Sequence, residues 1–211
     1  MGRSFKDSIL NPLERTIPAG LSPSAITGIS LIPGLATAVC AAAGWWGWSI
    51  GLFAINRVLD GLDGIVARRR GTQSDFGGYL DIMADFTVYA AIPIGVWLGA
   101  RGIAGDGGAT AGALPLVVLL AVFYVNAASW MYLSAILEKR GAQTAAAATA
   151  RAPLATSVTM PSGVVEGTET ILFFALFLLF PAQYAILFWV MAGATAAGVV
   201  QRLIWAAKTL L

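Results

Sequence analysis

The sequence predicts an all-α integral membrane protein, a bundle of six transmembrane helices. Of its 211 residues, 58% are hydrophobic and 11% are charged, whereas soluble domains average about 25% charged residues. The chain also has six apolar stretches of about the 20 residues that an α-helix needs to cross a bilayer. No remaining stretch is long enough for a soluble domain, so we expect residues 1–211 to form a single membrane domain.

Helix start and stop signals divide the apolar sequence into these spans. Ser22 or Ser24 can cap the first span beside Pro23, and Ser74 or Asp75 can cap the third. We expect the spans to lie near residues 24–43, 49–68, 75–99, 114–137, 163–180 and 183–208.

The first 20 residues differ from the rest because they are charged. Their apolar residues recur at helical spacing as far as Pro18, and they are Phe5, Ile9, Leu10 and Leu13. We therefore expect residues 1–20 to form a short amphipathic helix on the membrane surface, with a frayed tail as the alternative.

Basic residues are distributed unevenly over the predicted loops and termini. In a six-span arrangement, all 13 Lys and Arg residues except Arg57 and Arg101 fall at one membrane face. By the positive-inside rule this face is cytoplasmic, which places both termini in the cytoplasm. We interpret Arg69 and Arg70, in the loop after the second span, as charges that set topology and contact lipid headgroups.

Four aspartates lie inside the second and third spans. Asp60 and Asp63 are three residues apart and Asp81 and Asp85 are four apart, so each pair shares one face of its helix. An aspartate near the bilayer centre costs about 2.5–3.5 kcal/mol on insertion scales, and four together also repel one another. Oxygen ligands suit Mg²⁺, Mn²⁺ or Ca²⁺, and two divalent ions would neutralise the four carboxylates. Arg57 is either a structural counter-charge or a substrate ligand.

Small residues and one arginine accompany these aspartates. Gly64, Ala67 and Gly77 have almost no side-chain bulk, so they would let helices approach closely or let phosphates reach the backbone. Arg68 adds donors suited to phosphate. The chain contains no His, so acid–base chemistry would fall to the carboxylates. Together these residues predict a metal-dependent site for a phosphorylated ligand.

The aspartates and small residues together resemble the signature of the CDP-alcohol phosphatidyltransferases, a family of integral membrane phospholipid synthases. The pattern in this chain is Asp60-x-x-Asp63-Gly64-x-x-Ala67-Arg68, eight residues, then Gly77-x-x-x-Asp81-x-x-x-Asp85, with every fixed position met. The motif covers residues 60–85, and the family's six-helix membrane core would account for most of the chain. In the family, Pro-Asn commonly precedes a Thr at the start of the first span; here Ser24 replaces that Asn, before Thr27.

The resemblance implies transfer of a phosphatidyl group from CDP-diacylglycerol to the hydroxyl of a small polar alcohol or polyol phosphate, with release of CMP. It implies two ions of Mg²⁺ or Mn²⁺, bound by Asp60, Asp63, Asp81 and Asp85. It also implies Asp85 as the general base, and a nucleotide site at Gly64, Ala67, Arg68 and Gly77. We expect a homodimer whose active site faces the cytoplasm. We expect no nucleic-acid partner.

The acceptor alcohol is not determined by the motif. A phosphorylated acceptor would need a basic pocket, for which the candidates are Lys139, Arg140, Arg151 and Arg202. The same residues also satisfy the positive-inside rule without any ligand. Glu166 and Glu169 could attract an amino alcohol or choline-like cation, or they could pair with Arg151 or Arg202.

Two other functions use the same residues. Transfer of a phosphoalcohol from a soluble CDP-alcohol to diacylglycerol would need the same catalytic motif, and only a donor assay separates the two reactions. A more remote alternative is a cation or proton transporter with intramembrane aspartates. The Gly, Ala and Arg positions of the motif have no evident role in transport, and metal-dependent release of CMP would distinguish an enzyme from a transporter.

Overall fold

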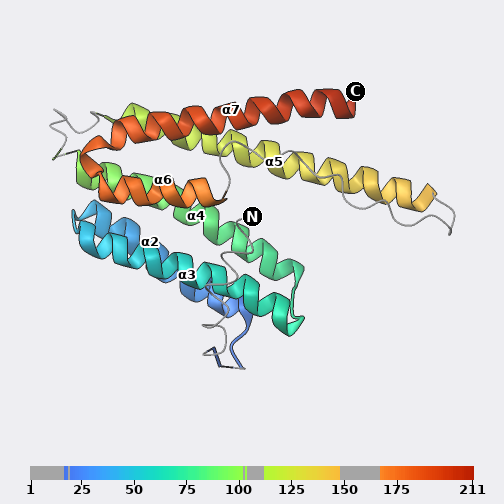
Figure 1. The fold of residues 1–211 in the computed structure, drawn as a ribbon, viewed down its shortest axis with the longest axis horizontal. Helices are drawn as coiled ribbons and strands as arrows, with labels where there is room; N and C mark the ends of the chain where they lie inside the picture. Colours follow the sequence, from blue (N-terminus) through green and yellow to red (C-terminus); the bar gives the residue numbers. More distant parts are fainter. Residues whose placement is uncertain (1–16, 19, 102, 104–111, 148–166) are drawn as a thin grey trace. The chain divides into compact units, whose positions relative to one another are not determined.

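A computed structural model describes residues 17, 18, 20–101, 103, 112–147 and 167–211, with the side chains of 142–147 excepted (Figure 1). All regular structure in these residues is helical. The helices are α2 (Pro23–Ala42), α3 (Trp46–Arg70), α4 (Asp75–Ala100), α5 (Ala113–Ala147), α6 (Gly167–Leu179), the short 3₁₀-helix η1 (Pro181–Gln183) and α7 (Tyr184–Leu210). Each expected span corresponds to one α-helix, so the all-α prediction is confirmed.

Four of these helical segments are long and apolar enough to cross a membrane: α2, α4, residues 113–141 of α5, and residues 181–210, which comprise η1 and α7. α3 is long enough but carries charges along its C-terminal half. The described part of α6 has only 13 residues. The count of six spans and the single domain over residues 1–211 therefore stay predictions. The amphipathic helix expected over residues 1–20 lies largely outside the described residues.

The predicted caps of α2 and α4 are present. Ser22 caps α2, and its Oγ accepts a hydrogen bond from the amide of Ala25 at 3.2 Å. Ser74 caps α4 in the same way, accepting from the amide of Gly77 at 3.1 Å. Each serine satisfies one of the amides that the first turn of a helix leaves without an intrahelical partner.

The chain divides into two compact units, which are described separately: Met1–Leu116 with Ile171–Leu187, and Val117–Thr170 with Phe188–Leu211. In the first unit α2 packs against both α3 and α4, and Figure 1 shows α2 and α3 side by side. α2 therefore joins the two helices that carry the aspartates.

Glycines allow α2 and α4 to approach with their backbones in contact. A Cβ atom at Gly95 would overlap the carbonyl oxygen of Ala38, and one at Gly99 would overlap that of Ala41. Gly95 and Gly99 are four residues apart, the small-xxx-small spacing that brings membrane helices together. Gly34 on α2 plays a similar part, since a Cβ there would lie 2.6 Å from a methyl carbon of Val88.

Buried polar side chains and an aromatic group complete the first unit. Asn56 on α3 is 1% exposed, and its Nδ2 donates to the carbonyl of Ser30 on α2 at 2.8 Å. Phe174 of α6 packs with its ring centroid 6.3 Å from that of Phe53 and 5.3 Å from that of Tyr89. α6 thereby contacts both aspartate-bearing helices.

The second unit contains most of α5 and α7. Arg202 on α7 is buried, and its Nη1 donates to Asn126 Oδ1 at 3.1 Å and to Ser129 Oγ at 3.4 Å, both on α5. Near the other end of α5, Arg140 donates to the carbonyls of Thr209 and Leu210 at 3.4 and 3.0 Å. A basic side chain here satisfies carbonyls that the end of α7 leaves open.

Candidate active site

A tight turn brings α3 and α4 together at their polar ends. α3 ends at Arg70 and is capped by Gly71, whose φ of 63° lies in the left-handed region that glycine adopts without strain. Three residues later, Ser74 starts α4. The chain therefore reverses within a few residues, and the aspartates on the two helices can approach one another.

Three of the four aspartates form an acidic cluster. Carboxylate oxygens of Asp60, Asp81 and Asp85 all lie within 4.8 Å of one another, and the three side chains are partly buried. Such a group of hard oxygen ligands is what Mg²⁺ or Mn²⁺ prefers. The spacing along the sequence predicted the pairing of Asp81 with Asp85 on α4, whereas on α3 only Asp60 of the predicted pair joins the cluster.

Arg57 is the positive partner of the acidic cluster. Its Nη1 lies 3.6 Å from Asp60 Oδ2 and 3.3 Å from Asp85 Oδ1. The guanidinium carbon also lies 5.8 Å from the ring centroids of Phe53 and Tyr89. Of the two roles considered for Arg57 from the sequence, these contacts favour the structural counter-charge.

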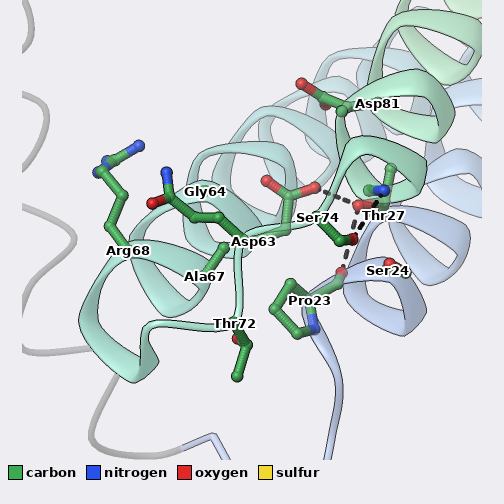
Figure 2. A pocket seen from close by; sticks show the side chains of 13 residues that line it. Pro23, Ser24, Thr27, Asp63, Gly64, Ala67, Arg68, Thr72, Ser74 and Asp81 are labelled. Atoms are coloured by element: carbon green, nitrogen blue, oxygen red, sulfur yellow. Dashed lines mark hydrogen bonds between the residues drawn. The ribbon is translucent and has the colours of Figure 1, made fainter. Parts of the chain in front are cut away.

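Asp63 makes a different contact from the other aspartates. It is only 6% exposed, and its Oδ2 accepts a hydrogen bond from the hydroxyl of Thr27 on α2. Figure 2 shows the two side chains pointing toward one another across the helix interface. Asp63 is not a member of the three-aspartate group, and its expected role as a metal ligand stays a prediction.

A pocket of about 190 Å³ opens between the start of α2, the end of α3, the connecting turn and the start of α4 (Figure 2). All four residues expected to surround a nucleotide line it, namely Gly64, Ala67, Arg68 and Gly77. Two of the motif's aspartates, Asp63 and Asp81, line it as well. Asp81 therefore belongs both to the pocket and to the acidic cluster, so the two are parts of one continuous site.

The chain was compared with known protein families and curated proteins. Residues 20–200 match the CDP-alcohol phosphatidyltransferase family. The chain is also 36% identical, over 166 residues, to the inner membrane protein YnjF of Escherichia coli (strain K12), which covers 79% of this chain and 73% of YnjF.

This chain belongs to the CDP-alcohol phosphatidyltransferase family. It is therefore an enzyme of phospholipid synthesis that transfers a substituted phosphate group, and the transporter alternative is set aside. Its apolar helices and its similarity to an inner membrane protein identify it as a multi-pass integral membrane protein.

Solved structures similar to this CDP-alcohol phosphatidyltransferase support the fold. Phosphatidylinositol phosphate synthase PgsA1 of Mycobacterium tuberculosis with CDP-DAG bound matches with a TM-score of 0.63 and 20% identity, over 94% of this chain and 91% of that chain. The same protein in complex with manganese and citrate matches with a TM-score of 0.61 and 20% identity, over 94% and 87% of the two chains. At this identity, the likeness establishes the shared fold.

Several polar residues of the transferase site were missed from the sequence. Ser24, Thr27, Thr72 and Ser74 also line the pocket, and all four bring hydroxyl groups to it. Ser74 was predicted only as a cap, and Ser24 and Thr27 were noted only as positions of the family's pattern at the start of the first span. Thr72 had no signal beyond its place in the turn before α4. The partner of Thr27, which is Asp63, lies 36 residues away.

The residues considered for the acceptor belong to the second unit where the structure describes them, and the remaining two lie in undescribed segments. Arg140 and Arg202 make the contacts with α7 and α5 given above, and Lys139 is exposed near Arg140. Glu169 is exposed in the first turn of α6. Arg151 and Glu166 lie outside the described residues. An acceptor role for any of the six stays a prediction.

Proposed function

We propose that this enzyme transfers a phosphatidyl group from CDP-diacylglycerol, or a related CDP-lipid, to the hydroxyl of a small polar alcohol or polyol phosphate and releases CMP. The proposal rests on one observation: Asp81 lines the pocket and also belongs to the acidic cluster, so the two adjoin. A pyrophosphate bound there would have its nucleotide side among small residues and its charged oxygens beside carboxylates that can hold metal ions. The CDP-DAG bound to PgsA1 supports the choice of donor.

The acidic cluster has the chemistry to hold a divalent cation. Oxygens from three carboxylates lie within 4.8 Å of one another, and hard oxygen ligands suit Mg²⁺ and Mn²⁺. Asp60, Asp81 and Asp85 would hold the first ion, and Asp63 would contribute to a second. When bound, the ions would offset the negative charge of the pyrophosphate and of the leaving CMP. The manganese in a PgsA1 structure supports this assignment.

The pocket residues would bind the nucleotide side of the donor. Gly64 and Gly77 leave room for the ligand to approach the backbone, as a Cβ at Gly77 would lie 3.1 Å from Ser74 Oγ. Arg68, which also lines the pocket, would donate to a phosphate oxygen. Ala67 completes this wall without adding bulk.

Asp85 would act as the general base. In the proposed reaction the acceptor hydroxyl oxygen forms a bond to the lipid-side phosphorus, the bond from that phosphorus to the CMP oxygen breaks, and the hydroxyl proton passes to Asp85. Asp85 lies in the acidic cluster but does not line the pocket. Asp85 is therefore not needed to bind the nucleotide, and we propose that it faces the acceptor.

The proposal also covers the membrane orientation of the enzyme, its assembly and its acceptor. We infer an active site that faces the cytoplasm, where the soluble acceptor is available, and a homodimeric assembly. A phosphorylated acceptor would draw on Lys139, Arg140, Arg151 and Arg202, whereas a cationic acceptor would draw on Glu166 and Glu169. Transfer from a soluble CDP-alcohol to diacylglycerol is the second candidate, because the same site would serve it.

The proposal is tested by release of CMP from the purified protein in detergent. CDP-diacylglycerol and Mg²⁺ are supplied with one acceptor at a time: glycerol 3-phosphate, inositol phosphate, inositol, serine, ethanolamine or choline. Release with one acceptor, abolished by EDTA, is the expected result and names the product. Absence of release with every acceptor, together with activity on a CDP-alcohol and diacylglycerol, would replace this reaction with the second candidate.

A further inference from the structure

A chain of buried contacts begins at α2 and ends at the carboxylate of Asp85. Asn56 donates to the carbonyl of Ser30 at 2.8 Å through Nδ2. Its Oδ1 accepts from Arg57 Nε at 2.8 Å and from Arg57 Nη2 at 2.6 Å. Because Asn56 is fixed at α2 and only 1% exposed, it holds two of the three nitrogens of the guanidinium in place.

The third nitrogen of Arg57 is directed at the acidic cluster. Nη1 lies 3.6 Å from Asp60 Oδ2 and 3.3 Å from Asp85 Oδ1. The faces of Phe53 and Tyr89 lie 5.8 Å from the guanidinium carbon and favour its positive charge. The side chain is therefore fixed by Asn56, the two rings and the two carboxylates, which is more than a surface ion pair provides.

Tyr89 holds the other oxygen of Asp85. Its hydroxyl donates to Asp85 Oδ2 at 3.2 Å, while Arg57 Nη1 donates to Oδ1 at 3.3 Å. The ring of Tyr89 is itself held edge-on against Phe174. With one donor on each oxygen, the plane of the Asp85 carboxylate is determined, and each oxygen retains a further lone pair.

We propose that Arg57 and Tyr89 are positioning residues of this active site: Arg57 is a built-in counter-charge that holds Asp60 and Asp85 together when no metal ion is bound, and both residues orient Asp85. The inference rests on the proposed function for the role of Asp85 as base. It extends that function to residues outside the signature motif, one turn before Asp60 and one turn after Asp85.

The physical reason is the cost of gathering carboxylates in a partly buried place. Asp60, Asp81 and Asp85 repel one another, and a divalent ion relieves this repulsion only while it is bound. Arg57 relieves part of it permanently, so the protein can keep the geometry of an ion site before the ion arrives. Outer-shell partners of this kind typically change metal affinity or activity about 10–100-fold when they are removed.

The first test measures thermal unfolding of the full-length protein in detergent, with EDTA and with saturating Mn²⁺. We expect Arg57→Gln to lower the Tm by about 5 °C or more in EDTA and by less than about 2 °C in Mn²⁺, since bound ions replace the missing charge. Arg57→Lys keeps the charge and should unfold close to the wild type in EDTA. An equal loss for Arg57→Gln in both conditions, or no effect of Mn²⁺ on any variant, would overturn the counter-charge role.

The second test separates orientation from packing through CMP release. Tyr89→Phe keeps the ring and removes the hydroxyl, so we expect kcat to fall about tenfold, with the KM for CDP-diacylglycerol and the Tm unchanged. Tyr124→Phe is the matched control, because Tyr124 is 78% exposed on α5. A Tyr89→Phe variant with wild-type kcat would overturn the role of Tyr89. If the wild type itself releases no CMP, the proposed reaction fails, while the Tm measurements still decide the role of Arg57.

Discussion

Asp60 and Asp63 lie one turn apart on the same helix, yet they have different surroundings. Asp60 belongs to the acidic cluster and lies 3.6 Å from the guanidinium of Arg57. Asp63 has a neutral partner, the hydroxyl of Thr27, and is buried against α2. Two aspartates that look equivalent in the sequence are thus held by different kinds of contact.

This difference shows two solutions to the same problem. A carboxylate inside a helix bundle must be compensated, because an unpaired buried charge is expensive. Asp60 and Asp85 are compensated by the opposite charge of Arg57, which leaves them available to a metal ion when it displaces or joins Arg57. Asp63 is compensated by a hydrogen bond that fixes its direction toward the wall of the pocket.

The largest effect is expected at Asp60, because both catalysis and metal-dependent binding of the nucleotide would be lost. In Asp60→Ala the acidic cluster loses a carboxylate and Arg57 loses a partner, so CMP release should fall by more than about 100-fold, beyond what loss of an outer-shell contact causes. Metal-dependent binding of CDP should also disappear, which calorimetry with and without Mg²⁺ would measure. Unchanged CDP affinity in the presence of Mg²⁺ would contradict the role of Asp60 as a metal ligand.

Asp85→Asn should affect catalysis more than binding. The amide keeps the shape of the side chain but cannot accept a proton, so we expect kcat to fall about 10²–10⁴-fold, the usual contribution of a general base. Much of the affinity for CDP-diacylglycerol should remain, because the amide keeps an oxygen that can still coordinate the ion and the other carboxylates of the motif stay in place. Steady-state kinetics with the donor varied would separate kcat from KM, and wild-type turnover would exclude Asp85 as the base.

Thr27→Val should have an intermediate effect, because it removes the hydroxyl that holds Asp63 and keeps the side-chain volume. We expect activity to fall about tenfold, since a buried polar group that loses its hydrogen-bond partner is destabilised by about 1–3 kcal/mol. Thr27→Ser should restore most of it. The matched control is Thr87→Val, because Thr87 is exposed and donates to the Met83 carbonyl of its own helix. Equal rates for Thr27→Val and the control would mean that Asp63 needs no such support.

The smallest effect is expected at Gly77. A Cβ there would lie 3.1 Å from Ser74 Oγ and 3.6 Å from Ser24 Oγ, so Gly77→Ala should narrow the pocket without touching the acidic cluster. The KM for the CDP-lipid should rise about threefold, a loss of less than about 1 kcal/mol, with kcat retained. Gly51→Ala on α3 is the control, because a Cβ there meets nothing within 4 Å. A fall in kcat alone would argue against a role in binding the donor.

Much of the fold could be predicted because each helix is specified locally. The apolar runs and the caps Ser22 and Ser74 can each be recognised from a few neighbouring residues. The predicted and observed helix ends differ most at α5, which continues to Ala147, ten residues beyond its predicted end. The Ala-rich composition of that stretch favours a helix although it is not strongly apolar.

The site could be predicted only as far as its residues are neighbours on one helix. Periodicity grouped the aspartates in pairs, but it carries no information on which pair member faces which helix. The contact of Thr27 with Asp63 and the support of Arg57 by Asn56 depend on how α2 packs on α3. The contacts of Arg70 could not be predicted for the same reason.

We interpreted Arg70 as a charge that sets topology and contacts headgroups, which stays a prediction. In addition, its Nη1 donates to the carbonyl of Leu21 at 2.9 Å and its Nη2 contacts the carbonyls of Ile17 and Pro18 at 3.3 and 3.4 Å. Arg70 thus fastens the segment before α2 to the end of α3. Only the tertiary structure brings these carbonyls, about 50 residues earlier in the chain, within its reach.

α2 carries none of the four aspartates, but it acts as a spacer for the helices that do. At one end its alanine carbonyls abut Gly95 and Gly99 of α4, and at the other end Thr27 holds Asp63 of α3. The separation of the carboxylates is therefore set partly by contacts more than two turns away from them. Because Mg²⁺ binds oxygen at about 2.0–2.1 Å and Ca²⁺ at about 2.3–2.6 Å, we expect a bulkier residue at Gly95 to alter the preference of the proposed site between these cations.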